Sequence, residues 1–125
     1  MMDVVKKVGV EVEEFKGEKR IVLKIHPKLA AYKAAVFPLV RKDGLDKKAK
    51  KIFETLNSNF NAFYDERGSI GRRYRRQDEI GTPFCITIDY DTKKDNTVTV
   101  RDRDTMKQKR VKIDEILGYI SKKLC

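Results

Sequence analysis

One short stretch of the sequence combines several arginines with an aromatic residue. It holds Arg67, Arg72, Arg73, Arg75 and Arg76, with Tyr74 among them. A guanidinium group makes bidentate contacts with phosphates and base edges, whereas a lysine acts as a point charge. With Ser69 as the N-cap of a helix, free backbone N–H groups and a positive dipole end would add to this charge. The stretch therefore predicts a surface that suits phosphates.

The expected side-chain directions on this helix leave two interpretations of the arginines open. At about 100° per residue, Arg72, Arg73 and Arg76 share one face, and Tyr74 lies on another. Tyr74 is therefore expected to be a core residue rather than a platform for stacked bases. The arginines either contact a polyanion or form a solvated face, in which they pair with the acidic residues that follow, Asp78 and Glu79.

A second candidate site is the run from Arg101 to Asp104, in which arginine and aspartate alternate. A carboxylate accepts a hydrogen bond from the N4 amino group of cytosine, while an adjacent arginine holds a phosphate or a carbonyl oxygen. Such base edges are exposed in single-stranded RNA. The alternative is a turn whose charges neutralise one another.

Catalytic and metal sites find little support in the sequence. The one histidine, His26, precedes Pro27 and is expected to have a structural or turn role, and no serine or cysteine has a histidine at a recognisable spacing. The run Gly68 to Gly71 matches neither type of phosphate-binding glycine loop. Four acidic residues could suggest a divalent metal but lack the spacing of a calcium loop: Asp89, Asp91, Asp102 and Asp104.

Composition favours a single basic domain with a polyanionic partner. The chain has 125 residues, with 29 Lys and Arg against 19 Asp and Glu, a net charge of +10 and a pI near 9.6. This length suits one domain, and the charge suits a polyanion, although a plain soluble surface is compatible with it. The apolar runs are too short for a membrane span, and residues 1–10 lack the apolar centre of a signal peptide. Two cysteines without a metal or disulfide spacing fit a reducing, cytoplasmic location.

Residues 1–20 are charged and weakly periodic, and we expect them to form a lead-in that holds at most a short strand. Residues 34–40 are an almost continuous apolar run, typical of a strand covered on both faces, and Pro38 is expected near its carboxyl end or at a bulge. Asp46 is the expected N-cap of a first helix, whose apolar stripe contains Ala49, Ile52, Phe53, Leu56 and Phe60.

The remaining elements follow from turn residues and alternation. Residues 61–66 predict a second strand, and a second helix is expected from Gly68-Ser69 to Gly81. Residues 84–88 and 97–101 predict a hairpin across the turn-rich segment 91–96. Residues 107–113 are expected to form an edge strand protected by lysines, and Asp114 is the expected cap of a last helix. This order requires a mixed sheet with helices packed on it, in which ligands bind beyond the carboxyl ends of strands, near the loops after Val40, Glu66 and Asp89.

Several of these segments together resemble a known family. The run GSIGRRYRRQDEIGTPF at 68–84, TIDYD at 87–91 and TVTVRDRDTM at 97–106 closely resemble the carboxyl-terminal anticodon-binding domain of glycyl-tRNA synthetases of the archaeal and eukaryotic type. LAAYKAAVFPLV at 29–40 is similar to the entry of that domain, with Ala31 where proline is expected. The resemblance covers roughly Ile21 to Leu124.

The resemblance implies a fold and a site. The fold is α/β, a three-layer α/β/α domain with three main helices and a five-stranded mixed sheet whose fourth strand runs opposite to the rest. Residues 27–125 would form this domain, and residues 1–26 would be a lead-in from a preceding domain or boundary. The RNA-binding residues carried over are Arg72, Arg73, Arg76, Thr87, Asp89, Arg101, Asp102, Arg103 and Asp104.

The resemblance also implies a function that the chain would perform as part of a larger enzyme. It would bind the anticodon stem-loop of glycine tRNA and orient it for aminoacylation by a catalytic domain, whose class II motifs are absent from these 125 residues. This domain would need no cofactor, while the parent enzyme would use ATP and magnesium and act as a homodimer in the cytoplasm. The alternative is an accessory subunit of the same fold that binds protein or nucleic acid.

Overall fold

The computed structural model describes residues 10–15 and 18–124, and it describes side chains from residue 21 onward. Parts of the predicted lead-in, residues 1–9 and 16–17, lie outside the described residues. Two antiparallel strands, β1 (Val10–Phe15) and β2 (Glu18–Leu23), pair with each other, and we call this pair the hairpin. The sequence predicted at most one short strand here.

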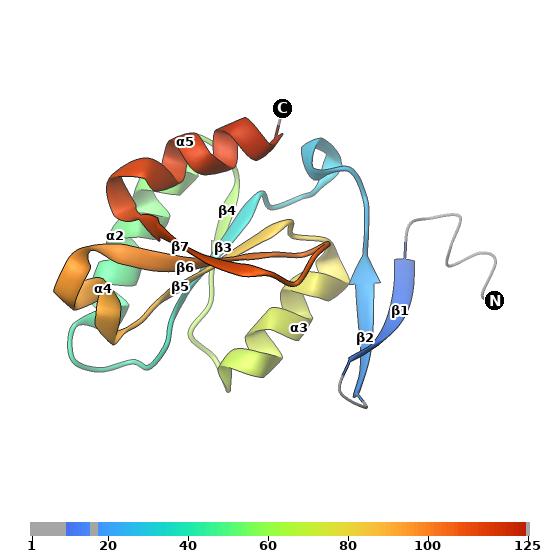
Figure 1. Ribbon diagram of the computed structural model, residues 1–125, viewed down its shortest axis with the longest axis horizontal. Helices are drawn as coiled ribbons and strands as arrows, with labels where there is room; N and C mark the ends of the chain where they lie inside the picture. Colours follow the sequence, from blue (N-terminus) through green and yellow to red (C-terminus); the bar gives the residue numbers. More distant parts are fainter. Residues whose placement is uncertain (1–9, 16–17, 125) are drawn as a thin grey trace.

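The main sheet has five strands in the order β4-β3-β5-β6-β7. These strands are β3 (Ala34–Pro38), β4 (Ala62–Tyr64), β5 (Phe84–Ile88), β6 (Thr97–Asp102) and β7 (Gln108–Lys112). Strands β4, β3 and β5 are parallel, and β6 runs antiparallel to both of its neighbours (Figure 1). The predicted mixed sheet, with its fourth strand reversed, is confirmed, and so is the position of β7 at an edge.

The two central strands are buried on both faces because helices cover both sides of the sheet. Every residue of β3 and β5 is buried, as the apolar run in the sequence predicted. Pro38 is the last residue of β3, where its missing N–H costs no ladder hydrogen bond.

Two helices pack on one face of the sheet and a third packs on the other. Helices α2 (Leu45–Asn57) and α5 (Ile113–Leu124) cover a core that contains Val36, Ile86 and Ile120. Helix α3 (Ile70–Ile80) covers a smaller cluster of Ala35, Phe37 and Cys85. Figure 1 shows α5 on one side of the sheet and α3 on the other. The three main helices and the α/β/α layers are therefore confirmed.

The hairpin packs on α3, which lies next to it in Figure 1. Val22 is fully buried. Gly81 ends α3 with φ of +83°, and a Cβ at this position would lie 3.0 Å from the carbonyl oxygen of Leu23. Glycine is thus required both by the left-handed turn and by the close approach of β2. After the hairpin, His26 accepts a hydrogen bond from the backbone N–H of Lys28 and caps the short helix η1 (Pro27–Leu29), which confirms its turn role.

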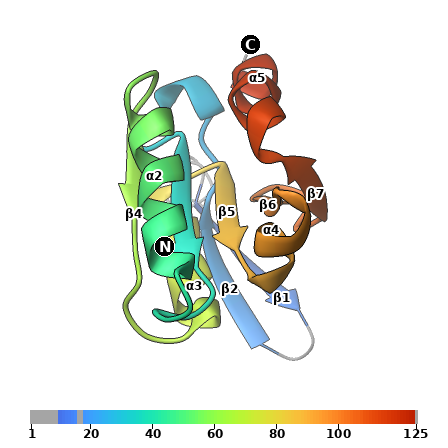
Figure 2. The ribbon, with the colours of Figure 1, turned by 90° about the vertical axis from the view of Figure 1, so that its left-hand side faces the viewer.

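Three helix starts differ from the sequence prediction. The predicted turn at 91–96 contains a short helix, α4 (Tyr90–Asp95), which lies beside the end of β5 in Figure 2. Its N-cap is Asp89, which forms a capping box with Thr92, and this polar segment lacks the apolar period that reveals longer helices. The N-cap of α2 is Gly44, with Asp46 in the first turn. Helix α5 begins at Ile113, so Asp114 also lies in its first turn and is not the cap.

Candidate nucleic-acid interface

Helix α3 carries the arginine cluster, and its ends are those expected from the sequence. The Ser69 hydroxyl accepts a hydrogen bond from the backbone N–H of Arg72, 3.3 Å away, and Gly81 is the C-cap. Arg72 and Arg76 are exposed. The predicted helix is confirmed, while the common face predicted for its arginines is wrong for Arg73, which is buried.

Arg73 joins the carboxyl ends of two strands from beneath the helix. Its guanidinium donates hydrogen bonds to the backbone carbonyls of Pro38, Leu39 and Asp65, at the ends of β3 and β4. Only 3% of the residue is exposed, and its Nε has no hydrogen-bond partner among the described residues. Burial lowers the pKa of Arg73, against the opposing effect of Asp65. Arg73 therefore holds the carboxyl ends of β3 and β4, from which the neighbouring loops begin.

Arg76 pairs with an aspartate from the preceding loop rather than with a neighbour on its own helix. Its Nε and Nη2 donate to Oδ2 of Asp65 at 3.0 and 2.8 Å, and Nη2 also donates to the carbonyl of Arg67. The Asp65 carboxylate is buried, but 44% of the Arg76 side chain is exposed. The pairing of Arg76 therefore fixes the side chain and leaves part of its guanidinium open to solvent.

Tyr74 belongs to the core beneath α3, as its position on the helix predicted. Its ring meets that of Phe37 edge-on at 5.5 Å, and the Arg101 guanidinium lies 4.7 Å from its centre. The Tyr74 hydroxyl is 2.6 Å from the Thr87 hydroxyl. Burial raises the pKa of Tyr74. The ring is occupied by protein contacts, which confirms the interpretation as a core residue.

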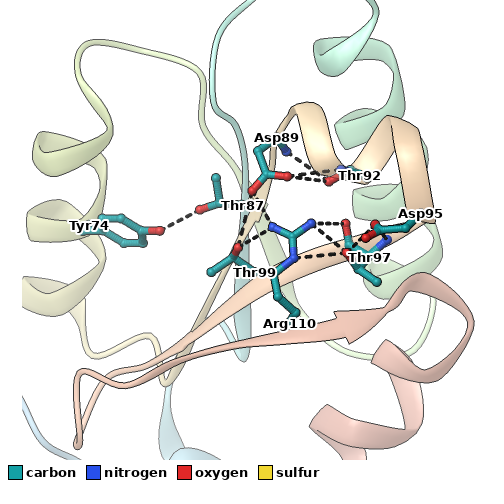
Figure 3. A network of polar contacts seen from close by, with 8 residues as sticks. All are labelled: Tyr74, Thr87, Asp89, Thr92, Asp95, Thr97, Thr99 and Arg110. Carbon is teal, nitrogen blue, oxygen red and sulfur yellow. Dashed lines mark hydrogen bonds and ion pairs between the residues drawn. The ribbon is translucent and has the colours of Figure 1, made fainter.

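A polar network at the end of β5 surrounds Arg110, a residue that the sequence analysis did not single out (Figure 3). Arg110 Nη1 donates to Asp89 Oδ2 at 2.6 Å and to the Thr99 hydroxyl at 2.9 Å. Its Nη2 and Nε donate to Thr97. Asp89 in turn accepts hydrogen bonds from the backbone N–H and hydroxyl of Thr92 in α4. The structure thus brings Asp89 and Thr87 together with Tyr74 and Arg110.

This network lies on a part of the sheet that we call the open face, formed by the α3-side residues of β6 and β7. Strand register places Thr97 opposite Lys112, Thr99 opposite Arg110, and Arg101 opposite Gln108. The two threonines are half-buried, and Gln108, Arg110 and Lys112 are exposed. Val98, Val100 and Val111 face the opposite side and are buried in the main core. The alternation of threonine and valine signalled a polar face, but the register that aligns Arg110 with Thr99 leaves no trace in the sequence.

The Arg101 to Asp104 run folds into a turn rich in internal contacts. Arg101 is buried and forms an ion pair with Asp78 of α3 at 3.2 Å. Asp102 Oδ1 accepts hydrogen bonds from the backbone N–H groups of Asp104 and Thr105. Arg103 is also buried, and its guanidinium donates to Asp104 and to three backbone carbonyls, those of Leu23, Ile25 and Gly81. Of the four residues in the run, Asp102 is partly exposed and Asp104 is exposed.

The nine predicted site residues fall at opposite ends of the strands. Thr87 and Asp89 lie at the carboxyl end of β5. The α3 N-terminus follows β4 at the same end of these parallel strands. The turn after β6 lies at the opposite end of the strands, because Asp102 pairs with Phe84 at the start of β5. Loops expected to border a ligand do meet at the carboxyl ends of the parallel strands. There the Tyr90 hydroxyl donates to the Asp43 carboxylate, and the Leu39 N–H donates to the Ile88 carbonyl. The predicted residues thus lie at two separate places, the carboxyl ends of the parallel strands and the turn after β6.

The described residues also bear on metal binding and on membrane insertion. Among residues 10–15 and 18–124, no group of three or more His, Cys, Asp or Glu side chains is arranged to hold a metal ion. Within the same described residues, no helix has the length and apolar character to cross a membrane.

The ion pair of Asp89 with Arg110 predicts an acid-sensitive contribution to stability. Burial raises the pKa of Asp89, but the hydrogen bond and charge of Arg110, together with Thr92, outweigh this effect and hold the pKa below its usual value. A lowered folded-state pKa stabilises the fold above the unfolded-state pKa of about 4, and this contribution disappears as the pH falls through the folded-state value. Asp89→Asn is therefore expected to cost about 1 kcal/mol at pH 7 and nothing at the acid end.

Urea unfolding of the wild type and of Asp89→Asn, from pH 7 down to a pH below the folded-state pKa of Asp89, measures the contribution of this carboxylate to the free energy of unfolding. Arg110→Gln serves as the matched variant, since it removes the partner and keeps the carboxylate. It should raise the Asp89 pKa, as followed by carboxyl resonances in a pH titration. A difference between wild type and Asp89→Asn that persists unchanged at the acid end would show that the carboxylate charge is not the source.

Comparison with known proteins adds a family and its relatives. A family model described as "Anticodon binding domain" matches residues 33–123. A glycine–tRNA ligase of Borreliella burgdorferi is 57% identical over 110 residues, which are 88% of this chain and 25% of that protein. For glycine–tRNA ligases of Clostridium tetani and Streptomyces coelicolor the identity is also 57%, over 108 and 109 residues, or 86% and 87% of this chain and 23% and 24% of theirs. The chain spans about a quarter of the length of these relatives.

Proposed function

This chain belongs to the anticodon-binding domain family, and we propose that it binds the anticodon stem-loop of glycine tRNA and orients that tRNA for aminoacylation. The likeness to glycine–tRNA ligases, at 57% identity over most of the chain, supports glycine tRNA as the partner. In this proposal a catalytic domain of the parent ligase performs the chemistry. The archaeal and eukaryotic type named for the resemblance stays a prediction.

The observation that carries the proposal is the open face beside the arginine helix. Arg72 and Arg76 are exposed on α3, and polar side chains line the neighbouring strands β6 and β7. Cationic side chains bind the phosphate backbone, and polar groups on a sheet can meet the edges and faces of unpaired bases. A single-stranded loop of RNA supplies both at once, which a double helix does not.

The nine site residues divide into two roles in this proposal. The residues that reach solvent or border the open face are proposed to contact RNA: Arg72, Arg76, Thr87, Asp89, Asp102 and Asp104. The buried arginines are proposed to act on the RNA through the backbone and side chains that they hold: Arg73, Arg101 and Arg103. Because the Asp102 turn and Asp89 lie at opposite ends of the strands, an RNA that touches both would have to run along the sheet from one end to the other.

The parent enzyme is the subject of a wider proposal. We propose that it is a homodimeric glycine–tRNA ligase of the cytoplasm and that ATP and magnesium act in its catalytic domain. The described residues offer magnesium no cluster of three acidic, histidine or cysteine side chains, so the ion does not fit here. No step of the function proposed for this domain passes through either group.

A binding titration tests the function directly. The chain is titrated with the glycine tRNA stem-loop and with a copy in which two bases of its anticodon are replaced. We expect the altered copy to bind more weakly by at least about tenfold, since each lost base contact is worth roughly 1–3 kcal/mol. If about four cationic groups neutralise phosphates, log K should fall with log salt at a slope of roughly −3.

The controls separate charge from recognition. A stem-loop of scrambled sequence keeps the phosphates and loses the anticodon, so it should bind with the same salt dependence and the weaker affinity. Equal affinity for the glycine and scrambled stem-loops at moderate salt would contradict the proposal. A flat salt response would exclude the electrostatic part.

A further inference from the structure

All hydrogen-bond donors of the Arg110 guanidinium are bonded to acceptors within the protein. An arginine has five N–H donors, which lie in the guanidinium plane. Here Nη1 donates to Asp89 and Thr99, Nη2 donates to the carbonyl and the hydroxyl of Thr97, and Nε donates to the same hydroxyl. These partners account for every donor. Arg110 therefore has no donor left for a base edge or a phosphate while the network is intact.

The same side chain is nevertheless partly open to solvent. The Arg110 side chain is 36% exposed, and its neighbours on the same side of β7, Gln108 and Lys112, are exposed as well. Because all five N–H groups are bonded within the protein, the parts of Arg110 that can still meet a ligand are its carbon chain and the face of its guanidinium. The open face thus presents a planar, cationic surface.

The acceptors around Arg110 are themselves fixed, so the plane is held in one orientation. The Thr97 hydroxyl donates to Asp95 at 2.6 Å while it accepts from Arg110. Asp89 is the N-cap of α4 and is bound by Thr92 (Figure 3). The hydrogen bond between Arg110 and Asp89 raises the pKa of Arg110, so the guanidinium stays charged. A group already held in its binding orientation loses little entropy when a ligand arrives.

We propose that the Arg110 guanidinium is the platform on which one unpaired base of the bound RNA stacks. Thr97 and Thr99 are then positioning residues that keep the plane parallel to the incoming base, and Asp89 has the same positioning role in addition to the RNA contact proposed for it above. Bases that are splayed out of a loop stack on guanidinium planes as they do on aromatic rings. A phosphate is the poorer ligand, because it needs free N–H donors and would meet the Asp89 carboxylate beside them. This inference rests on the proposed function.

A double-mutant cycle tests this stacking contact. Arg110→Lys keeps the charge and removes the plane. Stem-loops that lack a single base, one for each loop nucleotide in turn, remove the base and keep the phosphate. We expect Arg110→Lys to weaken binding of the intact stem-loop about tenfold, and to have an effect of less than about twofold on the one stem-loop that lacks the stacked base.

A matched control and a second variant accompany the cycle. Arg76→Lys makes the same change at another ion-paired, partly exposed arginine, and its effect should be the same for every stem-loop. Thr97→Val keeps Arg110 but removes the hydroxyl that accepts two of its hydrogen bonds. It should weaken binding about threefold, with the same dependence on that one base. Thermal unfolding verifies that each variant is folded, and Thr97→Val decides the test if Arg110→Lys does not fold.

Each outcome separates the stacking contact from the proposed function. If the wild type does not distinguish the glycine stem-loop from a scrambled one, the proposed function fails before the cycle begins. If it does distinguish them and Arg110→Lys has no effect, the stacking contact is absent. If Arg110→Lys weakens all stem-loops by one common factor, Arg110 acts only through the fold and the inference is wrong.

Discussion

Replacing Arg73 with alanine is expected to lower the free energy of unfolding by about 3 kcal/mol. The change removes the donor for the backbone carbonyls of Pro38, Leu39 and Asp65 at the ends of β3 and β4. Each carbonyl that stays buried without a donor costs roughly 1–3 kcal/mol, while removal of a desolvated charge with an unpartnered Nε offsets part of the loss. Urea denaturation of the isolated chain measures the difference.

Arg72→Ala is the matched control for this prediction. The two arginines are adjacent on α3 and have the same side chain, but Arg72 is exposed and its replacement should cost less than about 0.5 kcal/mol. Similar costs for the two variants would mean that Arg73 does not hold the strand ends. A loss of RNA affinity in Arg73→Ala therefore has to be measured at a temperature where the variant is folded, because unfolding alone would mimic it.

Asp78→Ala should lower the free energy of unfolding by a similar amount, about 3 kcal/mol. Asp78 is 2% exposed and pairs with Arg101, whose guanidinium lies over the Tyr74 ring between the sheet and α3. Without the carboxylate, a buried cation loses its counter-charge, and this is the costly way to break a buried ion pair. Thermal or urea unfolding at neutral pH measures the effect.

A second change should recover part of this loss. In Asp78→Ala with Arg101→Met, the buried cation is removed together with its carboxylate, so the double variant should be more stable than Asp78→Ala alone. Asp104→Ala is the matched control, because its carboxylate is 48% exposed and Arg103 keeps three carbonyl acceptors. It should cost about 0.5 kcal/mol. A double variant less stable than Asp78→Ala would show that Arg101 stabilises the fold by other contacts.

The sequence predicts those elements whose signals are local. Ser69 and Gly81 set the limits of α3 because a capping hydroxyl and a left-handed glycine act within one turn of the helix. The apolar run at 34–40 identified the central strand because burial on both faces removes polar residues. Helix α4 was missed because its stabilising contact is the capping box of Asp89 and Thr92, in a segment that also has the composition of a turn.

The site was harder to predict because its side chains are oriented by contacts distant in sequence. Arg72 and Arg73 are neighbours of one type, yet the carbonyl ends of two strands draw only Arg73 inward. Arg101 and Arg103 were expected at the surface, but Asp78 in one case and the backbone of residues 23–25 in the other bind them in the interior. Arg110 was overlooked because only the pairing of β6 with β7 sets it against Thr99 and Asp89.

The two edges of the main sheet have a consequence for self-association. At one edge, β4 pairs with β3 through only three residues. At the other, β7 has the sequence QKRVK, with four of its five residues exposed. A short edge gives an incoming strand few hydrogen bonds, and a charged edge repels a second copy of itself. Both edges are therefore poor templates for intermolecular strand pairing, so a chain with a net charge of +10 can reach a high local concentration without seeding aggregates.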